Sequence, residues 1–229
     1  MNDAILIIPA RDPTPELPKL VRALAPEFAK TVVVDDGSRA GRENFDPLAE
    51  IPGTVLLTHP GNLGKGAALK TAFRYVLDSG ARPAAVVTAD ADGQHRAEDV
   101  LAVAAAARAH PDALILGVRS FAGAVPFRSR LGNWWTIGEF ALLTGRLVRD
   151  TQSGLRAIPA ARLGELLTVP GERYEYEIGV LVRFARRSAV VEIPVATVYL
   201  DGNRASHFRP FADTVRTQLA LFRAGLARF

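Results

Sequence analysis

The sequence predicts an α/β domain in which a mainly parallel sheet is flanked by helices. Short apolar runs that are typical of buried strands alternate with amphipathic stretches of helical spacing, and this alternation favours parallel pairing. Polar motifs follow several of the predicted strands, where open α/β sheets bind their ligands. The 229 residues can form one substantial core, and no repeat or linker divides them, so we expect a single domain.

The predicted strands are continuous apolar or β-branched runs. They cover residues 4–9, 31–34, 54–58, 84–87, 113–117 and 190–198. Pro194 places the last of them at an edge of the sheet, because proline cannot donate to a neighbouring strand. The predicted helices cover residues 16–28, a stretch that ends near residue 77, residues 97–109, and residues 210–229. An acid-rich helix start is expected at 172–177.

Two stretches have more than one interpretation. Residues 131–143 are apolar and contain both tryptophans, Trp134 and Trp135, so they form either a core helix or an interfacial helix. The final helix has a stripe of apolar residues next to a row of arginines, which suits either a membrane surface or packing on the core. The stripe is Phe211, Val215, Leu219, Phe222 and Leu226, and the row is Arg209, Arg216 and Arg223.

Composition narrows the classes of function. The net charge is +4, and arginine dominates the basic residues because only four of the 28 are lysine. This balance favours phosphates or lipid head groups as partners. Nucleic acid is not expected, since no basic tail or RNA-binding signature is present. Cysteine is absent, which excludes thiolate chemistry. Without a signal-peptide pattern or a long apolar run, we expect a cytoplasmic protein that is soluble or peripheral to the membrane.

Two carboxylates and an amide follow the strand at 84–87. Asp90 and Asp92 are one residue apart, so in an extended segment they project side by side, and Gln94 adds an amide oxygen. An oxygen-only, anionic site suits Mg²⁺ or Mn²⁺. The alternative is a solvated acidic turn, because Asp and Gly are common turn residues.

A second acidic turn follows the strand at 31–34. Asp35 and Asp36 can accept hydrogen bonds from ribose hydroxyls and base N–H groups, which predicts a nucleoside contact. The alternative is a polar turn in which Gly37 supplies a positive φ.

A glycine loop at 61–66 precedes the next helix. It is not a Walker motif, which would need glycine at His59 and Ser or Thr at Gly66, and Leu63 breaks the dinucleotide-binding pattern. What remains is a loop with Lys65 at a helix N-terminus, which we interpret as an anion site of modest specificity.

The ordered motifs IIPARD, VVVDDGS, GNLGKGAAL, TADADGQ, GVRS and DTQSGLR extend over nearly the whole chain. Their order resembles that of family 2 glycosyltransferases with the GT-A (Rossmann-like) fold. Among these, the chain is most similar to the dolichyl- or polyprenyl-phosphate sugar synthases. The resemblance implies one GT-A domain over residues 1–229 with the basic amphipathic helix at its C-terminal end.

The resemblance also implies roles for individual residues. The nucleotide-binding set is Pro9, Arg11, Asp35, Asp36, Lys65, Asp90 and His207, where His207 stands at a position that the family often fills with lysine. The metal ligands are Asp92 and Gln94. The catalytic set is Asp90, Asp92, Arg119, Arg130, Asp150, Glu175 and Glu177. In it, the two arginines hold the acceptor phosphate, Asp150 shapes the sugar pocket, and one of the two glutamates lies near the donor sugar.

The resulting hypothesis is an inverting glycosyltransferase. It moves a hexose from UDP or GDP to a polyprenyl phosphate at the cytoplasmic membrane face, with Mg²⁺ or Mn²⁺ as cofactor. One alternative is a family 2 transferase with a carbohydrate or small-molecule acceptor, and another is a non-catalytic membrane-surface module. A nucleotidyltransferase is disfavoured because the segment after the first strand has no glycine.

Overall fold

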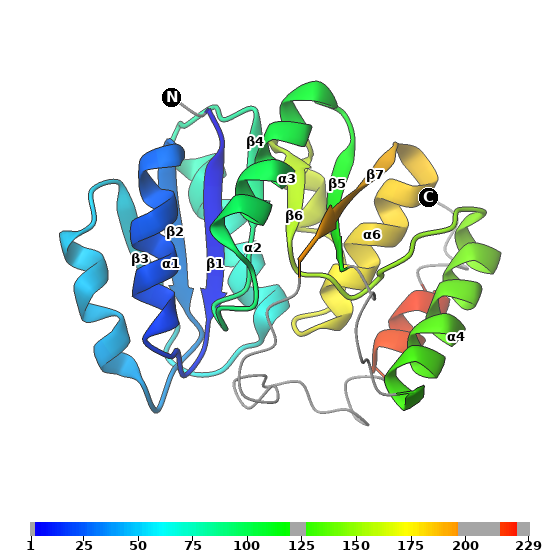
Figure 1. The fold of residues 1–229 in the computed structure, drawn as a ribbon, viewed down its shortest axis with the longest axis horizontal. Coiled ribbons are helices and arrows are strands. Elements are labelled where there is room, and N and C mark those ends of the chain that lie inside the picture. The colour runs from blue at the N-terminus through cyan, green and yellow to red at the C-terminus, as the bar shows by residue number, and fades with distance from the viewer. Residues whose placement is uncertain (1–2, 120–126, 197–215, 224–229) are drawn as a thin grey trace.

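The computed structural model describes residues 3–119, 127–196 and 216–223, with backbone only for 127–135. Within these ranges, seven strands form one sheet in the order β3-β2-β1-β4-β6-β5-β7 (Figure 1). The strands are β1 Ile5–Ala10, β2 Lys30–Asp35, β3 Thr54–Thr58, β4 Ala85–Thr88, β5 Leu114–Arg119, β6 Arg156–Pro159 and β7 Val190–Val195. All run parallel except β6, which is antiparallel to both of its neighbours. The predicted mainly parallel α/β sheet is confirmed.

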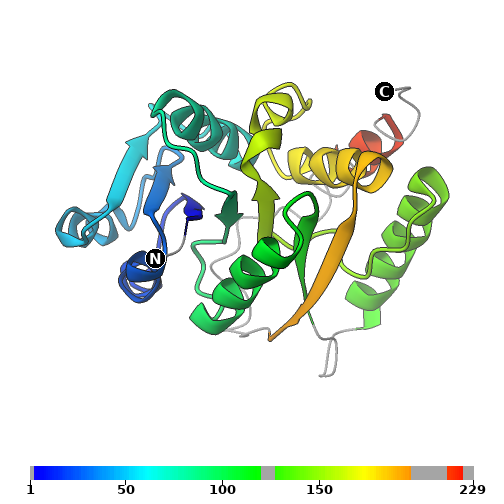
Figure 2. The same ribbon diagram turned by 90° about the horizontal axis from the view of Figure 1, so that it is seen from above.

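Helices cover both faces of the sheet. They are α1 Glu16–Leu24, α2 Lys65–Asp78, α3 Ala97–Ala109, α4 Phe127–Thr144, α5 Leu163–Leu166 and α6 Glu175–Arg187. Figure 2 shows α2 and α6 on one face and α1 and α3 on the other. Residues 216–223 are helical and contact α4 through a hydrogen bond between the side chains of Gln218 and Thr136. In the described ranges, no helix combines the length and apolarity that crossing a membrane requires.

Two hydrophobic cores lie on opposite faces of the sheet. Successive residues of β1 alternate between them: Ile5 and Ile7 pack with α2 and α6, whereas Leu6 and Ile8 pack with α1 and α3. This is the two-residue period of a strand that is buried on both sides. It explains why the strand appears in the sequence as a continuous apolar run.

The predicted elements agree with the structure to within a few residues, but two of the described elements were not predicted. They are β6, whose four residues include Arg156 and Pro159, and the single-turn helix α5. Helix α1 stops at Leu24, earlier than expected, because Pro26 follows, and 25–27 form a 3₁₀ turn. Among the strands that the structure describes, β7 lies at an edge of the sheet, as predicted. Of the predicted helix 210–229, only 216–223 lies within the described residues.

The strand register brings the polar motifs to one edge of the sheet. Ala10 of β1 is level with Asp35 of β2, which is level with Thr58 of β3. On the other side of β1, Ile7 is level with Thr88 of β4. The segments that follow these parallel strands therefore meet at the lower edge of the sheet in Figure 1.

Candidate active site

A lysine that bridges two carboxylates forms the centre of the site. Lys65, the first residue of α2, places its Nζ 2.6 Å from Oδ1 of Asp90 and 2.9 Å from Oε2 of Glu177. Asp90 follows β4, and Glu177 lies in the first turn of α6. Three elements that are distant in sequence are thus joined by one ammonium group. Its side chain is only 15% exposed, so the contacts are shielded from solvent.

This environment keeps both partners charged. Burial alone would raise the pKa of Asp90, but the charge of Lys65 and a hydrogen bond from His95 hold that pKa well below its ordinary value. Burial likewise opposes the charge on Lys65, and the two carboxylates outweigh it and raise the pKa of this ammonium. The lysine and Asp90 therefore remain ionised throughout the neutral range.

Gly154 has no side chain, and the ion pair of Lys65 and Asp90 occupies the space that a side chain at this position would fill. A Cβ at this position would lie 2.5 Å from Oδ2 of Asp90 and 2.6 Å from Nζ of Lys65. Its φ is not positive, so the requirement for glycine is spatial. The Gly154 carbonyl accepts a hydrogen bond of 2.8 Å from Thr88, which fixes the loop before β6 against the end of β4. This close approach explains the glycine of the DTQSGLR motif.

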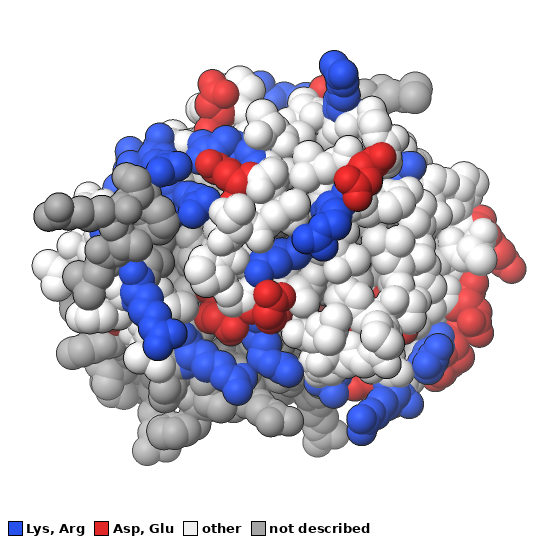
Figure 3. Space-filling view, turned by 180° about the vertical axis from the view of Figure 1, so that it is seen from behind, with Lys and Arg blue, Asp and Glu red and all other residues white. Residues whose placement is uncertain are grey.

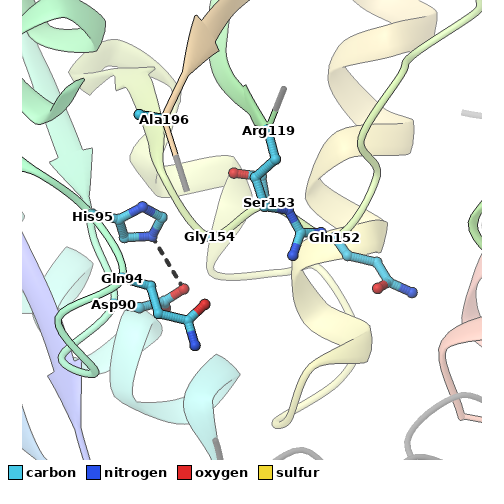
Figure 4. A pocket seen from close by; sticks show the side chains of 8 residues that line it. All are labelled: Asp90, Gln94, His95, Arg119, Gln152, Ser153, Gly154 and Ala196. Carbon is cyan, nitrogen blue, oxygen red and sulfur yellow. Dashed lines mark hydrogen bonds and ion pairs between the residues drawn. The ribbon is translucent and has the colours of Figure 1, made fainter. Parts of the chain in front are cut away.

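A small pocket opens beside the ion pair (Figure 4). It is lined by Asp90, Gln94, His95, Arg119, Gln152, Ser153, Gly154 and Ala196. Arg119 approaches Asp150 at two points, with Nε 2.6 Å from Oδ2 and Nη2 3.0 Å from Oδ1. Asp150 was predicted to shape the sugar pocket. Its side chain is fully buried and faces Arg119, so it affects the pocket by positioning that arginine.

The sequence interpretation missed Arg156, which is 1% exposed. Its guanidinium donates to the carbonyl oxygens of Ser153 at 2.8 Å and Glu177 at 2.6 Å, linking the loop before β6 to α6. Burial lowers the pKa of Arg156, and nearby carboxylates, Glu177 foremost, oppose that shift. Its Nη2 and the Oε1 of Glu177 are both buried without a hydrogen-bond partner. The available signal was a charged residue inside an otherwise apolar run, Leu155 to Ile158.

The residues around Asp92 fit a divalent ion. Burial and the charge of Asp90 raise the pKa of Asp92, so this carboxylate lacks full compensation by a cation. Its Oδ1 accepts a hydrogen bond of 3.0 Å from the backbone N–H of Gln94, which holds the two residues together. No group of three His, Cys, Asp or Glu residues is arranged for a metal among the residues that the structure describes. A site with one or two carboxylates still suits Mg²⁺, because substrate phosphates and water commonly supply the remaining ligands of this ion.

The predicted nucleoside turn is more constrained than the sequence suggested. Asp35 is 3% exposed and accepts a hydrogen bond from the Ser38 amide. Asp36 is 4% exposed and accepts from the amides of Leu63 and Gly64, at 2.9 and 2.8 Å. The predicted anion site of the glycine loop is therefore filled by a carboxylate of the protein itself.

Two further predicted residues lie at the end of the first strand. Pro9 belongs to β1 and Arg11 directly follows it, and both are half-buried. Asp12, which follows them, accepts hydrogen bonds from the amides of Arg39 and Ala40. The Asp12 carboxylate thus ties this loop to the segment after β2.

The two candidate glutamates, Glu175 and Glu177, have different partners in the structure. Glu177 faces the site through Lys65. The Oε1 of Glu175 instead accepts from the amides of Glu172 and Arg173, just before its own helix. Arg130 lies in α4 with its side chain outside the described residues, and His207 lies outside them altogether. The predicted roles of these two residues stay predictions.

A model of glycosyl transferase family 2 matches residues 5–157, and the chain belongs to this family. With its mainly parallel sheet, it is a GT-A, nucleotide-sugar-dependent glycosyltransferase. The match ends within β6, so Glu177 lies beyond it. The family assignment also removes the alternative of a non-catalytic module.

Individual relatives agree with this assignment. An uncharacterized protein of Methanocaldococcus jannaschii is 27% identical over 207 residues, covering 87% of this chain and 83% of that protein. The UDP-N-acetylglucosamine–dolichyl-phosphate N-acetylglucosaminyltransferase of Methanococcus voltae is 27% identical over 222 residues, covering 87% of both. Glucosyl-3-phosphoglycerate synthase from Mycobacterium tuberculosis, solved with Mn²⁺, UDP-glucose and phosphoglyceric acid, superposes with a TM-score of 0.72 at 17% identity. That superposition covers 99% of this chain and 80% of the other and shows the shared fold.

Proposed function

We propose that the protein transfers a hexose from a UDP- or GDP-linked sugar to a polyprenyl phosphate, with inversion at the anomeric carbon. The observation that carries the proposal is Arg119, which lines the same pocket as Asp90 and is held by buried Asp150. A guanidinium fixed in this way suits the oxygens of an acceptor phosphate. The similarity to a dolichyl-phosphate transferase supports the same acceptor class.

The site acts by stabilising charge and orienting the reactants rather than by transferring a proton. An oxygen of the acceptor phosphate bonds to the anomeric carbon while the bond from that carbon to the diphosphate breaks, and the nucleoside diphosphate leaves with the electron pair. The acceptor is already ionised at neutral pH, so no strong general base is required. A divalent ion held by Asp92 and Gln94 would neutralise the charge on the diphosphate. Arg119 orients the acceptor phosphate for attack.

The helix at 216–223 offers a surface that suits the membrane in which such an acceptor resides. Leu221 is fully buried, whereas Leu219 and Phe222 are 52% and 53% exposed. Two exposed arginines accompany them on the outer side, Arg216 and Arg223. Figure 3 shows Lys and Arg side chains in both halves of that view, with more of them on its left. We propose that this apolar and basic face lies on an anionic membrane at the cytoplasmic side.

An acceptor assay tests the proposal. The protein is incubated with radiolabelled UDP- or GDP-hexose, Mn²⁺ and either polyprenyl phosphate in vesicles or 3-phosphoglycerate in solution. We expect lipid-extractable product only with the polyprenyl phosphate, and a loss of about tenfold or more in Arg119→Gln, as for a lost charge-assisted hydrogen bond. Product formed only with the soluble acceptor would refute the lipid proposal and favour the small-molecule alternative.

Vesicle sedimentation tests the membrane face separately. Phe222→Glu should reduce binding to vesicles that contain anionic lipid. The matched control is Leu56→Glu on β3 at the far end of the sheet, where a leucine is 41% exposed, and it should leave binding unchanged. Equal binding of the two variants would argue against this face.

A further inference from the structure

Arg156 lies at a position where the strand pattern predicts an apolar residue. It is the first residue of β6, and its neighbours Leu155 and Ala157 pack in the core that α1 and α3 cover. Alternate residues of a strand face the same way, so Arg156 and Ile158 face the other core, beneath α2 and α6. A fully buried guanidinium at such a position needs a specific explanation, because arginine is rarely buried completely.

The guanidinium connects the loop before β6 to helix α6. We call this loop, residues 150–155, the pocket loop. Nε of Arg156 donates to the carbonyl oxygen of Ser153 at 2.8 Å, and Nη1 donates to that of Glu177 at 2.6 Å. Ser153 lines the pocket (Figure 4), whereas the side chain of Glu177 contacts Lys65 at 2.9 Å. One residue therefore holds both the loop that borders the pocket and the helix that contributes to its central ion pair.

The space between the pocket loop and α6 is narrow. A Cβ on Gly154 would lie 2.5 Å from Oδ2 of Asp90 and 2.6 Å from Nζ of Lys65, so a small shift of the loop toward α6 would displace this ion pair. The guanidinium is planar, and Nε and Nη1 donate in different directions, so it fixes the spacing of the two carbonyl groups that it contacts. A lysine at this position would keep the charge but place all its donors on one atom.

The surroundings of Arg156 favour a role in the site over a role in stability alone. Burial lowers its pKa, and the carboxylates that oppose this shift, Glu177, Asp150 and Asp90 in that order, all lie at the active site. Among the residues that the structure describes, its buried Nη2 has no hydrogen-bond partner. A buried donor without a partner costs stability, so this arrangement is not the most stable one that the core could have. Local rules of this kind are broken mainly at functional sites.

We propose that Arg156 is a positioning residue for glycosyl transfer. Its two carbonyl contacts set the distance between the pocket loop and α6, and thereby keep the ion pair of Lys65 and Asp90 aligned with Arg119. Arg156 itself touches neither substrate and acts through the loop and the helix. The inference rests on nucleotide-sugar-dependent transfer, which the family assignment shows, and not on the proposed acceptor.

The test compares Arg156→Met and Arg156→Lys with the wild type, well below the Tm of each protein. Rates at saturating UDP- or GDP-hexose with Mn²⁺ give kcat for transfer to polyprenyl phosphate, to 3-phosphoglycerate or to water, whichever the wild type uses. We expect kcat to fall about a hundredfold in Arg156→Met, as for a misplacement of about 1 Å, and about tenfold or more in Arg156→Lys. The KM for the donor should change much less, because alignment affects the attack more than the binding.

Arg183→Met is the matched control. Arg183 is also an arginine that holds a backbone carbonyl, since it donates to that of Glu165 at 3.0 Å. This contact joins α6 to α5, and neither residue lines the pocket. Its loss should lower the Tm and leave kcat unchanged. Arg156→Lys keeps the charge and most of the length of the side chain, so it decides the question if Arg156→Met does not fold.

A double-mutant cycle separates positioning from a purely structural role. If Arg156 acts through the contact between Glu177 and Lys65, Arg156→Met combined with Glu177→Gln should lower kcat by less than the product of the two separate losses. Losses that simply multiply would overturn the proposal, and so would a wild-type kcat in either Arg156 variant. Product formed with 3-phosphoglycerate in place of the lipid would refute the acceptor proposal alone, because the same ratios of kcat are then measured with that acceptor.

Discussion

Replacing Lys65 by methionine should destabilise the protein markedly. The substitution keeps the apolar stem and removes the charge that Asp90 and Glu177 share, so two carboxylates are left close together with side chains that are 29% and 9% exposed. Breaking a buried ion pair by removing one partner costs about 3–5 kcal/mol. Because Asp90 keeps its contact with His95 and some solvent, we expect the lower end, about 3 kcal/mol in the free energy of unfolding. For a chain of this size that corresponds to a fall in Tm of about 6–12 °C.

Calorimetry at neutral pH measures the effect, and a double-mutant cycle assigns it. Glu177→Gln removes one of the two carboxylates, so Lys65→Met should cost less in that background, with a coupling of about 1 kcal/mol or more. Lys19→Met is the control, because the pair that Lys19 forms with Glu16 is exposed and should contribute less than about 1 kcal/mol. A Tm of Lys65→Met within about 2 °C of the wild type would refute the reasoning, since that shift corresponds to about 1 kcal/mol or less.

The destabilisation should also depend on pH in a defined direction. The pKa of Asp90 is lowered in the folded protein, so its contribution is present above the ordinary aspartate value of about 4 and is lost as the pH falls through the folded value. The difference in stability between Lys65→Met and the wild type should therefore persist at neutral pH. It should shrink in acid, which unfolding experiments in a pH series would show.

Two other substitutions test the surroundings of this pair. Gly154→Ala places a methyl group 2.5 Å from Asp90, so we expect transfer activity to fall about a hundredfold, as for a misplacement of about 1 Å. The control is Gly164→Ala, whose methyl group would meet nothing within 4 Å and which should stay active. Asp92→Asn should raise the Tm of the metal-free protein at neutral pH, because a raised carboxyl pKa means that ionisation costs stability above it. The same variant should lose the increase in Tm that Mn²⁺ and a nucleoside diphosphate give the wild type, and a metal-induced increase equal to that of the wild type would contradict the metal assignment.

The parts of the fold that depend on local signals could be predicted from the sequence. Strands such as β1 and β3 are continuous apolar or β-branched runs, and the motifs at their ends contain turn residues, so both the strand and its polar end are visible locally. Their meeting at one edge follows from parallel pairing alone. The candidate metal-binding turn at Asp90 and Asp92 is therefore recognisable from the amino-acid sequence.

The partners of the charged residues could not be predicted in the same way. Whether Glu175 or Glu177 faces the site depends on the rotation of α6 against α2, which no local pattern records. Arginine is rarely buried completely, so Arg156 had no reason to be placed in the core. Likewise, the apolar stripe of the last helix fitted both a membrane and a core, and the membrane proposal depends on the exposure of Leu219 and Phe222, which the sequence does not give.

The antiparallel direction of β6 explains why the active site is assembled where it is. Parallel strands contribute the residues that follow them, which is why Asp90 comes after β4 and Arg119 ends β5. Strand β6 lies between these two and runs the other way, so it begins at the edge where they end. The residues before it, from Asp150 to Leu155, are thereby placed between Asp90 on the proposed donor side and Arg119 on the proposed acceptor side. A short strand with little apolar signal thus joins the two halves of the pocket, and the requirement for Gly154 follows from that junction.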